Sequence, residues 1–238
     1  MELTAPLDRG RLVKRYKRFL ADVDLASGER VTAHCANPGA MLGVAPEGAT
    51  VWLEPSSNPK RKLLWSWRLV EIDGALVGID TSHPNVLAEE AVKAARIPEL
   101  SGYATLRREV KYGQNSRIDL LIESPDRPPA YVEVKNVHLM REPGLAEFPD
   151  CVTARGAKHL RELADMVAQG ARAVMLFIVQ RTDCDRFALA ADLDPAYAQA
   201  FATARDAGVE ALVWACDVRT TGIDAVRPLP FAPISDPA

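Results

Sequence analysis

Seven apolar residues in succession, AVMLFIV, occupy positions 173–179. Successive side chains of a strand point to opposite faces of a sheet, so a strand of this kind needs an apolar cover on both sides. Strands like this lie at the centre of sheets that carry helices on both faces. The run therefore predicts a layered mixed α/β domain with a central mixed sheet.

The residues around this run alternate between strand and helix patterns. Apolar positions recur with helical spacing in three segments and with strand spacing in several others. We expect helices at 84–97, 154–169 and 195–207, and strands at 105–112, 118–123, 130–138, near Phe187 and at 210–216. The Pro-rich end after Val226 is expected to be a tail.

The first third of the chain has a different pattern, with short strands separated by turn residues. These strands are expected at 18–25, 29–36, 49–54, 63–72 and 75–79, and Asp73-Gly74 is a hairpin signal between the last two. About five short strands in so few residues suggest a small barrel of the oligonucleotide-binding (OB-fold) type. We therefore expect an OB-fold-like nucleic-acid-binding domain at residues 1–82 and an α/β domain at residues 83–238.

Charge and cysteine content limit the function classes. The formal net charge of -3 means that affinity for a polyanion must come from local basic patches. The four cysteines are widely spaced and form no zinc pattern, which fits free thiols in a reducing compartment. No segment approaches the roughly 20 apolar residues of a membrane span. A cytoplasmic protein without a membrane partner is expected.

Two predicted strands each carry acidic residues in an apolar setting. Asp119 interrupts the first, and Glu133 and Lys135 share one face of the next because alternate strand residues point the same way. If the strands pair through their short connection, the two carboxylates converge. Buried acids need compensation, and a hard cation supplies it. The alternative is a structural ion pair at a strand edge.

Magnesium or manganese suits this arrangement. Mg²⁺ prefers oxygen ligands and keeps several waters, so Asp119, Glu133 and the backbone carbonyl of Val134 suffice to hold it. The cation would assist deprotonation of an attacking water. Lys135 would orient that water or stabilise the transition-state charge. The predicted reaction is hydrolysis of a phosphodiester bond.

A third acid often completes such sites from an upstream helix. Glu89, on the predicted helix at 84–97, is the preferred candidate and is counted with the catalytic residues. Glu90 on the same helix and Glu109 on the preceding strand remain alternatives. A solvated acidic face accounts for the two helix residues equally well.

Three basic groups are candidate DNA contacts because cations neutralise phosphates and neighbouring aromatic rings can stack on bases. The first group, at residues 15–18, lies in an early strand region that also contains Tyr16 and Phe19. The second, at residues 60–62, precedes Trp65. The third, at residues 155–159, lies on the predicted helix at 154–169. His34, next to the Asn-Pro-Gly turn, is interpreted as a turn or core histidine and not as a ligand. The candidate residues are Arg15, Lys17, Arg18, Lys60, Arg61, Lys62, Arg155, Lys158 and His159. The alternatives are a solvated basic face for the first two groups and a helix-surface ion-pair pattern with Glu162 for the third.

The chain resembles known families at two levels. Asp119 followed by Glu133-x-Lys135 is similar to the PD-(D/E)XK nuclease pattern, although Ile118 replaces the proline that is common before the first acid. Longer segments resemble the sugar fermentation stimulation protein A family over nearly the whole chain. They are HCANPGAM at 34–41, NPKRK at 58–62, YVEVKNV at 131–137, FPD at 148–150 and RGAKHLREL at 155–163.

The family resemblance implies an OB-type barrel, a restriction-endonuclease-like α/β domain, DNA binding and a role in regulating sugar (maltose) metabolism. It leaves two functions open. One is a Mg²⁺-dependent deoxyribonuclease acting on single-stranded, duplex or branched DNA. The other is a non-catalytic DNA-binding regulator that retains the nuclease fold. Whether the chain forms a homodimer is also left open.

Overall fold

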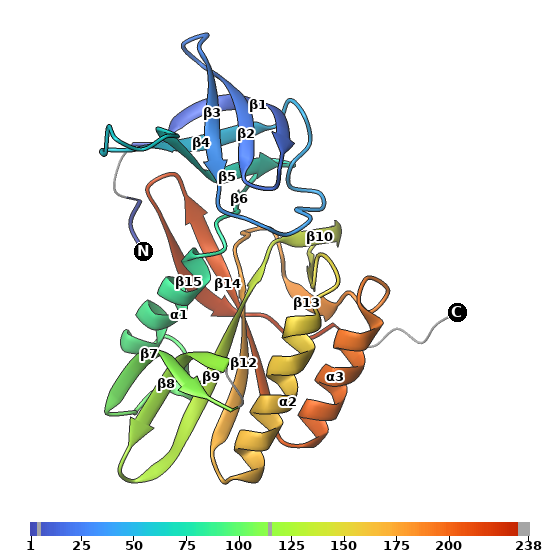
Figure 1. Cartoon of the computed structure of the whole chain (residues 1–238). Coiled ribbons are helices and arrows are strands. Elements are labelled where there is room, and N and C mark those ends of the chain that lie inside the picture. The colour runs from blue at the N-terminus through green and yellow to red at the C-terminus, as the bar shows by residue number, and fades with distance from the viewer. Residues whose placement is uncertain (4–5, 114–115, 233–238) are drawn as a thin grey trace.

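A computed structural model describes residues 1–3, 6–113 and 116–232. Figure 1 shows a barrel stacked on a larger layered part, with the N-terminal end of the chain beside their junction. The barrel contains β1 (Asp8–Tyr16), β2 (Leu20–Leu25), β3 (Arg30–Cys35), β4 (Thr50–Pro55), β5 (Trp65–Ile72) and β6 (Ala75–Gly78).

The barrel closes through five strands. β1 pairs with both β2 and β4, β2 pairs with β3, and β4 pairs with β5. A parallel pairing of β3 with β5 completes the ring, and β6 extends β5 as a hairpin. Trp67, Leu53 and Leu12 fill its interior without exposure above 1%. This confirms the predicted barrel, although β1 begins ten residues before the first expected strand.

The larger part contains a six-stranded sheet in the order β15-β14-β12-β9-β8-β7 and a smaller sheet in the order β10-β11-β13. Its elements are α1 (His83–Lys93), a 3-10 turn (Pro98–Leu100), β7 (Thr105–Tyr112), β8 (Ser116–Ser124), β9 (Arg127–Val137), β10 (Leu139–Glu142), β11 (Leu145–Phe148), α2 (Ala154–Ala168), β12 (Arg172–Val179), β13 (Arg186–Leu189), α3 (Pro195–Asp206), β14 (Glu210–Arg219) and β15 (Gly222–Pro228). The expectation of a tail after Val226 is wrong, because β15 runs to Pro228 and Leu229 is buried.

The apolar run forms the centre of the large sheet. β12 is parallel to β9 on one side and to β14 on the other, whereas β7, β8 and β15 are antiparallel to their neighbours. Leu176 and its alternate neighbours pack towards α1, and Phe177 and its alternate neighbours pack towards α2 and α3. α1 therefore covers one face and the other two helices cover the opposite face (Figure 1). The predicted mixed α/β class is confirmed.

Close backbone contacts join the barrel to this sheet. The amide of Gly78 donates to the carbonyl of Gln180 at 2.9 Å. A Cβ on Gly78 would lie 2.6 Å from Oε1 and 3.1 Å from Cβ of Gln180, so a larger residue here would have to displace the Gln180 side chain. Gln180 also donates to Asn136 Oδ1 at 2.7 Å and to the carbonyl of Asp80 at 3.2 Å. These hydrogen bonds fix the barrel over the end of β9 and β12.

Candidate functional site

Asp119 lies where β8 and β9 separate. The ladder between the two strands ends at the Leu120–Val132 pair. Beyond it, the Val134 amide donates to Asp119 Oδ2 at 2.8 Å, and Asn85 Nδ2 on α1 donates to Oδ1 at 2.7 Å. Both carboxylate oxygens are thus positioned by neighbouring groups.

Glu133 and Lys135 share one face of β9, as their spacing predicts. Lys135 Nζ donates to Glu133 Oε1 at 2.6 Å, and the same oxygen contacts His159 Nδ1 on α2. His159 Nε2 accepts from Arg155 Nε at 3.3 Å, so the other ring nitrogen carries the proton and donates to Glu133. Glu133 is 3% exposed, and its Oε2 is buried without a hydrogen-bond partner among the described residues.

The two acids have opposite pKa shifts. Burial and then the charge of Glu133 raise the pKa of Asp119 to about 6. Burial alone would raise the pKa of Glu133, but Lys135 and His159 outweigh it and lower that pKa. A cation near both groups would favour the charged form of Asp119 and relieve its repulsion with Glu133.

The oxygen atoms here fit a hard divalent cation. Asp119 and Glu133 supply two carboxylates, and the unsatisfied Oε2 of Glu133 is an acceptor without a donor. Over residues 1–3, 6–113 and 116–232, no group of three or more acid, histidine or cysteine side chains is placed to hold a metal. Two carboxylates and the Val134 carbonyl still suffice for Mg²⁺, because this ion keeps several waters.

An open cavity of about 430 Å³ lies above these acids. Its walls come from the barrel, from α1, from β9 and from the start of α2. The lining residues are Asn37, Pro38, Gly39, Thr81, Asn85, Asp119, Glu133, Val134, Lys135, Asn136, His138, Phe148, Asp150, Thr153, Arg155, Gly156 and His159. The predicted trio therefore shares one cavity with a barrel loop.

That barrel loop, residues 37–39, is held from both sides. Arg15 donates to the carbonyls of Asn37 and Gly39 at 2.8 and 3.0 Å. Asn37 Nδ2 donates to the carbonyl of Ile79 at 2.9 Å. The amide of Met41 donates to Asp150 Oδ2, also at 2.9 Å. Arg15, predicted as a DNA contact, thus has a partly buried guanidinium that secures the cavity wall.

A second cavity of about 320 Å³ adjoins the first through Arg155 and His159. Arg117 and Lys158 bring two further cations to its lining, and Glu109 and Ser116 complete it. Lys158 donates to Ser116 Oγ at 3.1 Å and lies 3.4 Å from Glu162 Oε1. Arg155 and Lys158 thus lie together as predicted, whereas His159 is buried against Glu133.

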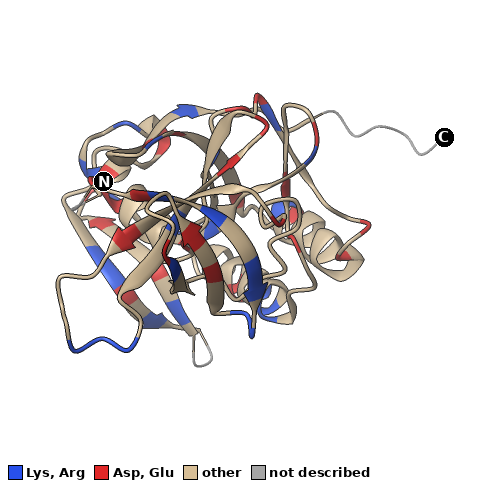
Figure 2. Cartoon of the chain, turned by 90° about the horizontal axis from the view of Figure 1, so that it is seen from above, with Lys and Arg blue, Asp and Glu red and all other residues tan. Residues whose placement is uncertain are grey.

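The other predicted basic residues occupy two exposed barrel segments. Lys17 and Arg18 form the β1–β2 turn, and residues 60–62 lie in the loop between β4 and β5. Seen from above, basic and acidic residues are mixed and neither sign dominates (Figure 2). The basic character is local, in keeping with the net charge of -3.

The candidate third acids do not line the cavity above Asp119. Glu89 pairs with Lys93 at 2.6 Å and with Arg108 at 3.1 Å. Glu90 pairs with the amino group of Met1 at 2.6 Å. The α1 residue that contacts Asp119 is Asn85, one turn before Glu89.

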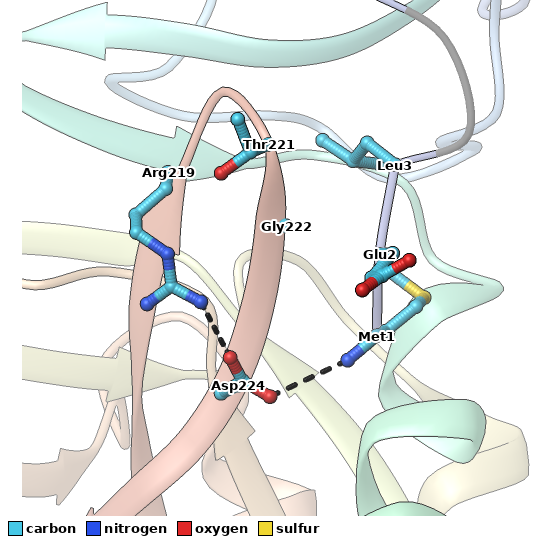
Figure 3. A pocket seen from close by; sticks show the side chains of 7 residues that line it. All are labelled: Met1, Glu2, Leu3, Arg219, Thr221, Gly222 and Asp224. Atoms are coloured by element: carbon cyan, nitrogen blue, oxygen red, sulfur yellow. Dashed lines mark hydrogen bonds and ion pairs between the residues drawn. The ribbon is translucent and has the colours of Figure 1, made fainter.

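A separate pocket of about 440 Å³ lies where the N-terminal residues meet β14 and β15. The Met1 amino group lies 3.4 Å from Asp224 Oδ1, and Arg219 pairs with the other oxygen at 2.5 Å (Figure 3). This pocket shares no lining residue with the cavity above Asp119. Asp224 pairs with both cations, and the pocket brings no carboxylate to the candidate site.

Sequence reasoning missed Asn85, Arg117 and the wall formed by residues 37–39. Asn85 stands four residues before Glu89, a helical neighbour that an acid search passes over. The loop at 37–39 belongs to a recognised motif, but nothing local indicates that it faces β9. Arg117, two residues before Asp119, has only its basic charge as a signal.

Two family models match the chain. The model described as "Sugar fermentation stimulation protein RE domain" matches residues 82–222, and "SfsA N-terminal OB domain" matches residues 13–79. These matches agree with the predicted order of an OB-type barrel and a restriction-endonuclease-like domain. Within the residues that the structure describes, no helix is long and apolar enough to span a bilayer.

Individual relatives match over nearly their whole lengths. A sugar fermentation stimulation protein homolog of Maricaulis maris is 60% identical, covering 96% of this chain and 97% of the relative. A homolog of Rhodospirillum centenum is 62% identical, with 96% and 98% covered. The solved structure of Pyrococcus furiosus SfsA in complex with Ca²⁺ is 28% identical, with a TM-score of 0.87 and 98% of each chain covered.

Proposed function

We propose that this chain, which belongs to the sugar fermentation stimulation protein family, is a DNA-binding protein that hydrolyses phosphodiester bonds with Mg²⁺ or Mn²⁺. The observation that carries the proposal is the buried Oε2 of Glu133, which has no hydrogen-bond partner among the described residues, on a residue that lines one cavity together with Asp119 and Lys135. A buried carboxylate oxygen without a donor is costly, and a cation would compensate it. The Ca²⁺ in the Pyrococcus furiosus relative supports a divalent ion.

Each residue of this site has a distinct role. Asp119, Glu133 and the Val134 carbonyl would hold the cation, which when bound would supply positive charge to the phosphate and favour deprotonation of water. Lys135 places its ammonium beside Glu133, where it stabilises developing charge on the phosphate oxygens. His159 is a positioning residue, because its contact with Glu133 Oε1 leaves Oε2 for the cation.

The DNA would contact three basic groups. Loops that join the first two and the last two strands of OB barrels are common oligonucleotide sites. Here these loops carry Lys17 and Arg18, and residues 60–62. Arg117, Arg155 and Lys158 around the second cavity supply phosphate contacts beside the reaction site, in the way that cations usually position a nucleic acid.

We also place the domain boundary between residues 82 and 83, just before α1 enters the second core. A cytoplasmic location accords with the four free cysteines. Neither point is needed for the reaction.

The test uses purified full-length protein with labelled single-stranded, duplex and branched DNA. We expect cleavage in Mg²⁺ or Mn²⁺ and none in EDTA. Asp119→Asn and Glu133→Gln should each reduce the rate by at least about 100-fold, as for removal of other groups that stabilise charge in a transition state. Glu123→Gln is the matched control, because Glu123 is on the same strand as Asp119 and pairs with Arg107 at 2.7 Å outside the cavity.

Binding and cleavage should be measured on the same preparation. DNA binding without cleavage by the wild-type protein, in every metal tested, would contradict the nuclease proposal. That result would favour a non-catalytic DNA-binding regulator of sugar metabolism. Equal cleavage by wild type and Asp119→Asn would show that the activity belongs to a contaminant.

A further inference from the structure

Phe19 and His34 form an aromatic pair on the outside of the barrel. Their rings are nearly parallel, at an interplanar angle of 11°, with centroids 6.4 Å apart. Phe19 is 46% exposed, which is unusual for an aromatic residue in a chain that buries most of its large apolar side chains. Phe231 is also exposed, but its ring packs against Phe187 and Phe201 of the core.

The turn before Phe19 presents two cations in a strained backbone. Lys17 and Arg18 have φ values of 49° and 63°, a region that residues with side chains rarely adopt. Hairpin turns of this geometry usually carry Asn or Gly, so the two long basic side chains are a poor choice for stability alone. Neither forms an ion pair within the described part of the chain. Strained residues of this kind are concentrated at ligand-binding positions.

Short backbone links join the aromatic pair to the wall of the main cavity. The carbonyl of Phe19 accepts from the Cys35 amide at 2.8 Å. Asn37, which lines the cavity, is three residues from His34, and three residues span at most about 11 Å. Arg15, on the same hairpin as Phe19, secures Asn37 through its carbonyl at 2.8 Å.

We propose that Phe19 and His34 are a base-stacking platform for single-stranded nucleic acid, which runs from the β1–β2 turn past residues 37–39 to the acids. This inference rests on the proposed function and names its substrate class. A base in a duplex has both faces covered by neighbours, whereas an unpaired base offers a face to an aromatic ring. Lys17 and Arg18 contact the adjacent phosphates.

Binding is measured by fluorescence anisotropy in EDTA, so that no cleavage occurs, using a labelled single-stranded oligonucleotide and the matching duplex. Phe19→Leu keeps an apolar side chain but removes the ring. It should weaken single-strand binding about tenfold, which is in the range for loss of one stacked base. Duplex binding should change less than about twofold. Phe19→Trp should retain single-strand affinity, and Phe231→Leu is the control at another exposed phenylalanine.

Several results would overturn the platform. These are unchanged single-strand affinity in Phe19→Leu, an equal loss on single strand and duplex, or the same loss in Phe231→Leu. Because binding is measured without metal, the outcome is separate from the nuclease test. Binding that depends on Phe19, without cleavage in Mg²⁺, would support the stacking platform and contradict the nuclease proposal. Cleavage in Mg²⁺, with binding that does not depend on Phe19, would support the nuclease proposal and contradict the platform.

Discussion

Asp150 connects the cavity-lining barrel loop to the second domain, and its charge should contribute measurably to folding. Its Oδ2 accepts from the Met41 amide at 2.9 Å and lies 3.4 Å from His138 Nε2. Burial would raise the pKa of Asp150, but His138 and the Met41 amide outweigh it and lower the pKa from 3.8 to about 2. The perturbation we consider is Asp150→Asn, which keeps the shape of the side chain and removes the charge.

The magnitude follows from proton linkage. A pKa lower in the folded than in the unfolded chain means that the charged form stabilises the fold at pH values above the unfolded pKa. A shift of nearly two units corresponds to about 2.5 kcal/mol of unfolding free energy. This contribution is complete near pH 7, falls to about half at pH 3 and is lost as the pH drops through about 2. Asp150→Asn should therefore cost about 2 kcal/mol at pH 7 and about 1 kcal/mol at pH 3.

Urea unfolding monitored by tryptophan fluorescence at pH 7, 5 and 3 gives these differences. Asp126→Asn is the control, because Asp126 is 69% exposed and its pair with Arg127 spans 3.5 Å. A substitution at such a site usually changes stability by less than about 0.5 kcal/mol. An equal cost of Asp150→Asn at pH 3 and pH 7, or a cost at pH 7 no larger than that of the control, would show that the charge of Asp150 does not stabilise the fold.

Four further substitutions test the site. Gly39→Ala would place its Cβ 2.8 Å from Asp150 Oδ2, so the loop must shift; we expect a loss of about 1–3 kcal/mol in thermal unfolding and slower cleavage. Lys135→Ala should slow cleavage about 100-fold while Mn²⁺ binding measured by calorimetry persists, since its nitrogen contacts Glu133 and adds no metal ligand. Asn85→Ala should reduce cleavage more than Glu89→Gln, because only Asn85 contacts Asp119; the opposite order would favour Glu89 as the third acid.

Local sequence patterns predicted much of the fold because they reflect short-range geometry. The apolar run at 173–179 predicted a central strand covered on both faces, and β12 is that strand. The alternation of side-chain direction along β9 predicted that Glu133 and Lys135 share one face. In the structure Lys135 Nζ lies 2.6 Å from Glu133 Oε1 on that face. By contrast β1 was missed, because four of its nine residues are basic and only Gly10 and Leu12 are buried.

The composition of the cavity depended on contacts between distant segments. Nothing near Asn37 or Gly39 in the sequence indicates that they share a cavity with Glu133 on β9, more than 90 residues later. The sequence predicted Arg15 and His159 as DNA contacts on the surface. In the structure, Arg15 donates to the carbonyl of Asn37 in the loop at 37–39, and His159 contacts Glu133. The sequence alone determined the strand that carries each acid, since side-chain direction in a strand repeats every two residues. Only the packing of the barrel on the sheet decided which other residues meet those acids, because that packing joins segments whose separation along the chain carries no periodic signal.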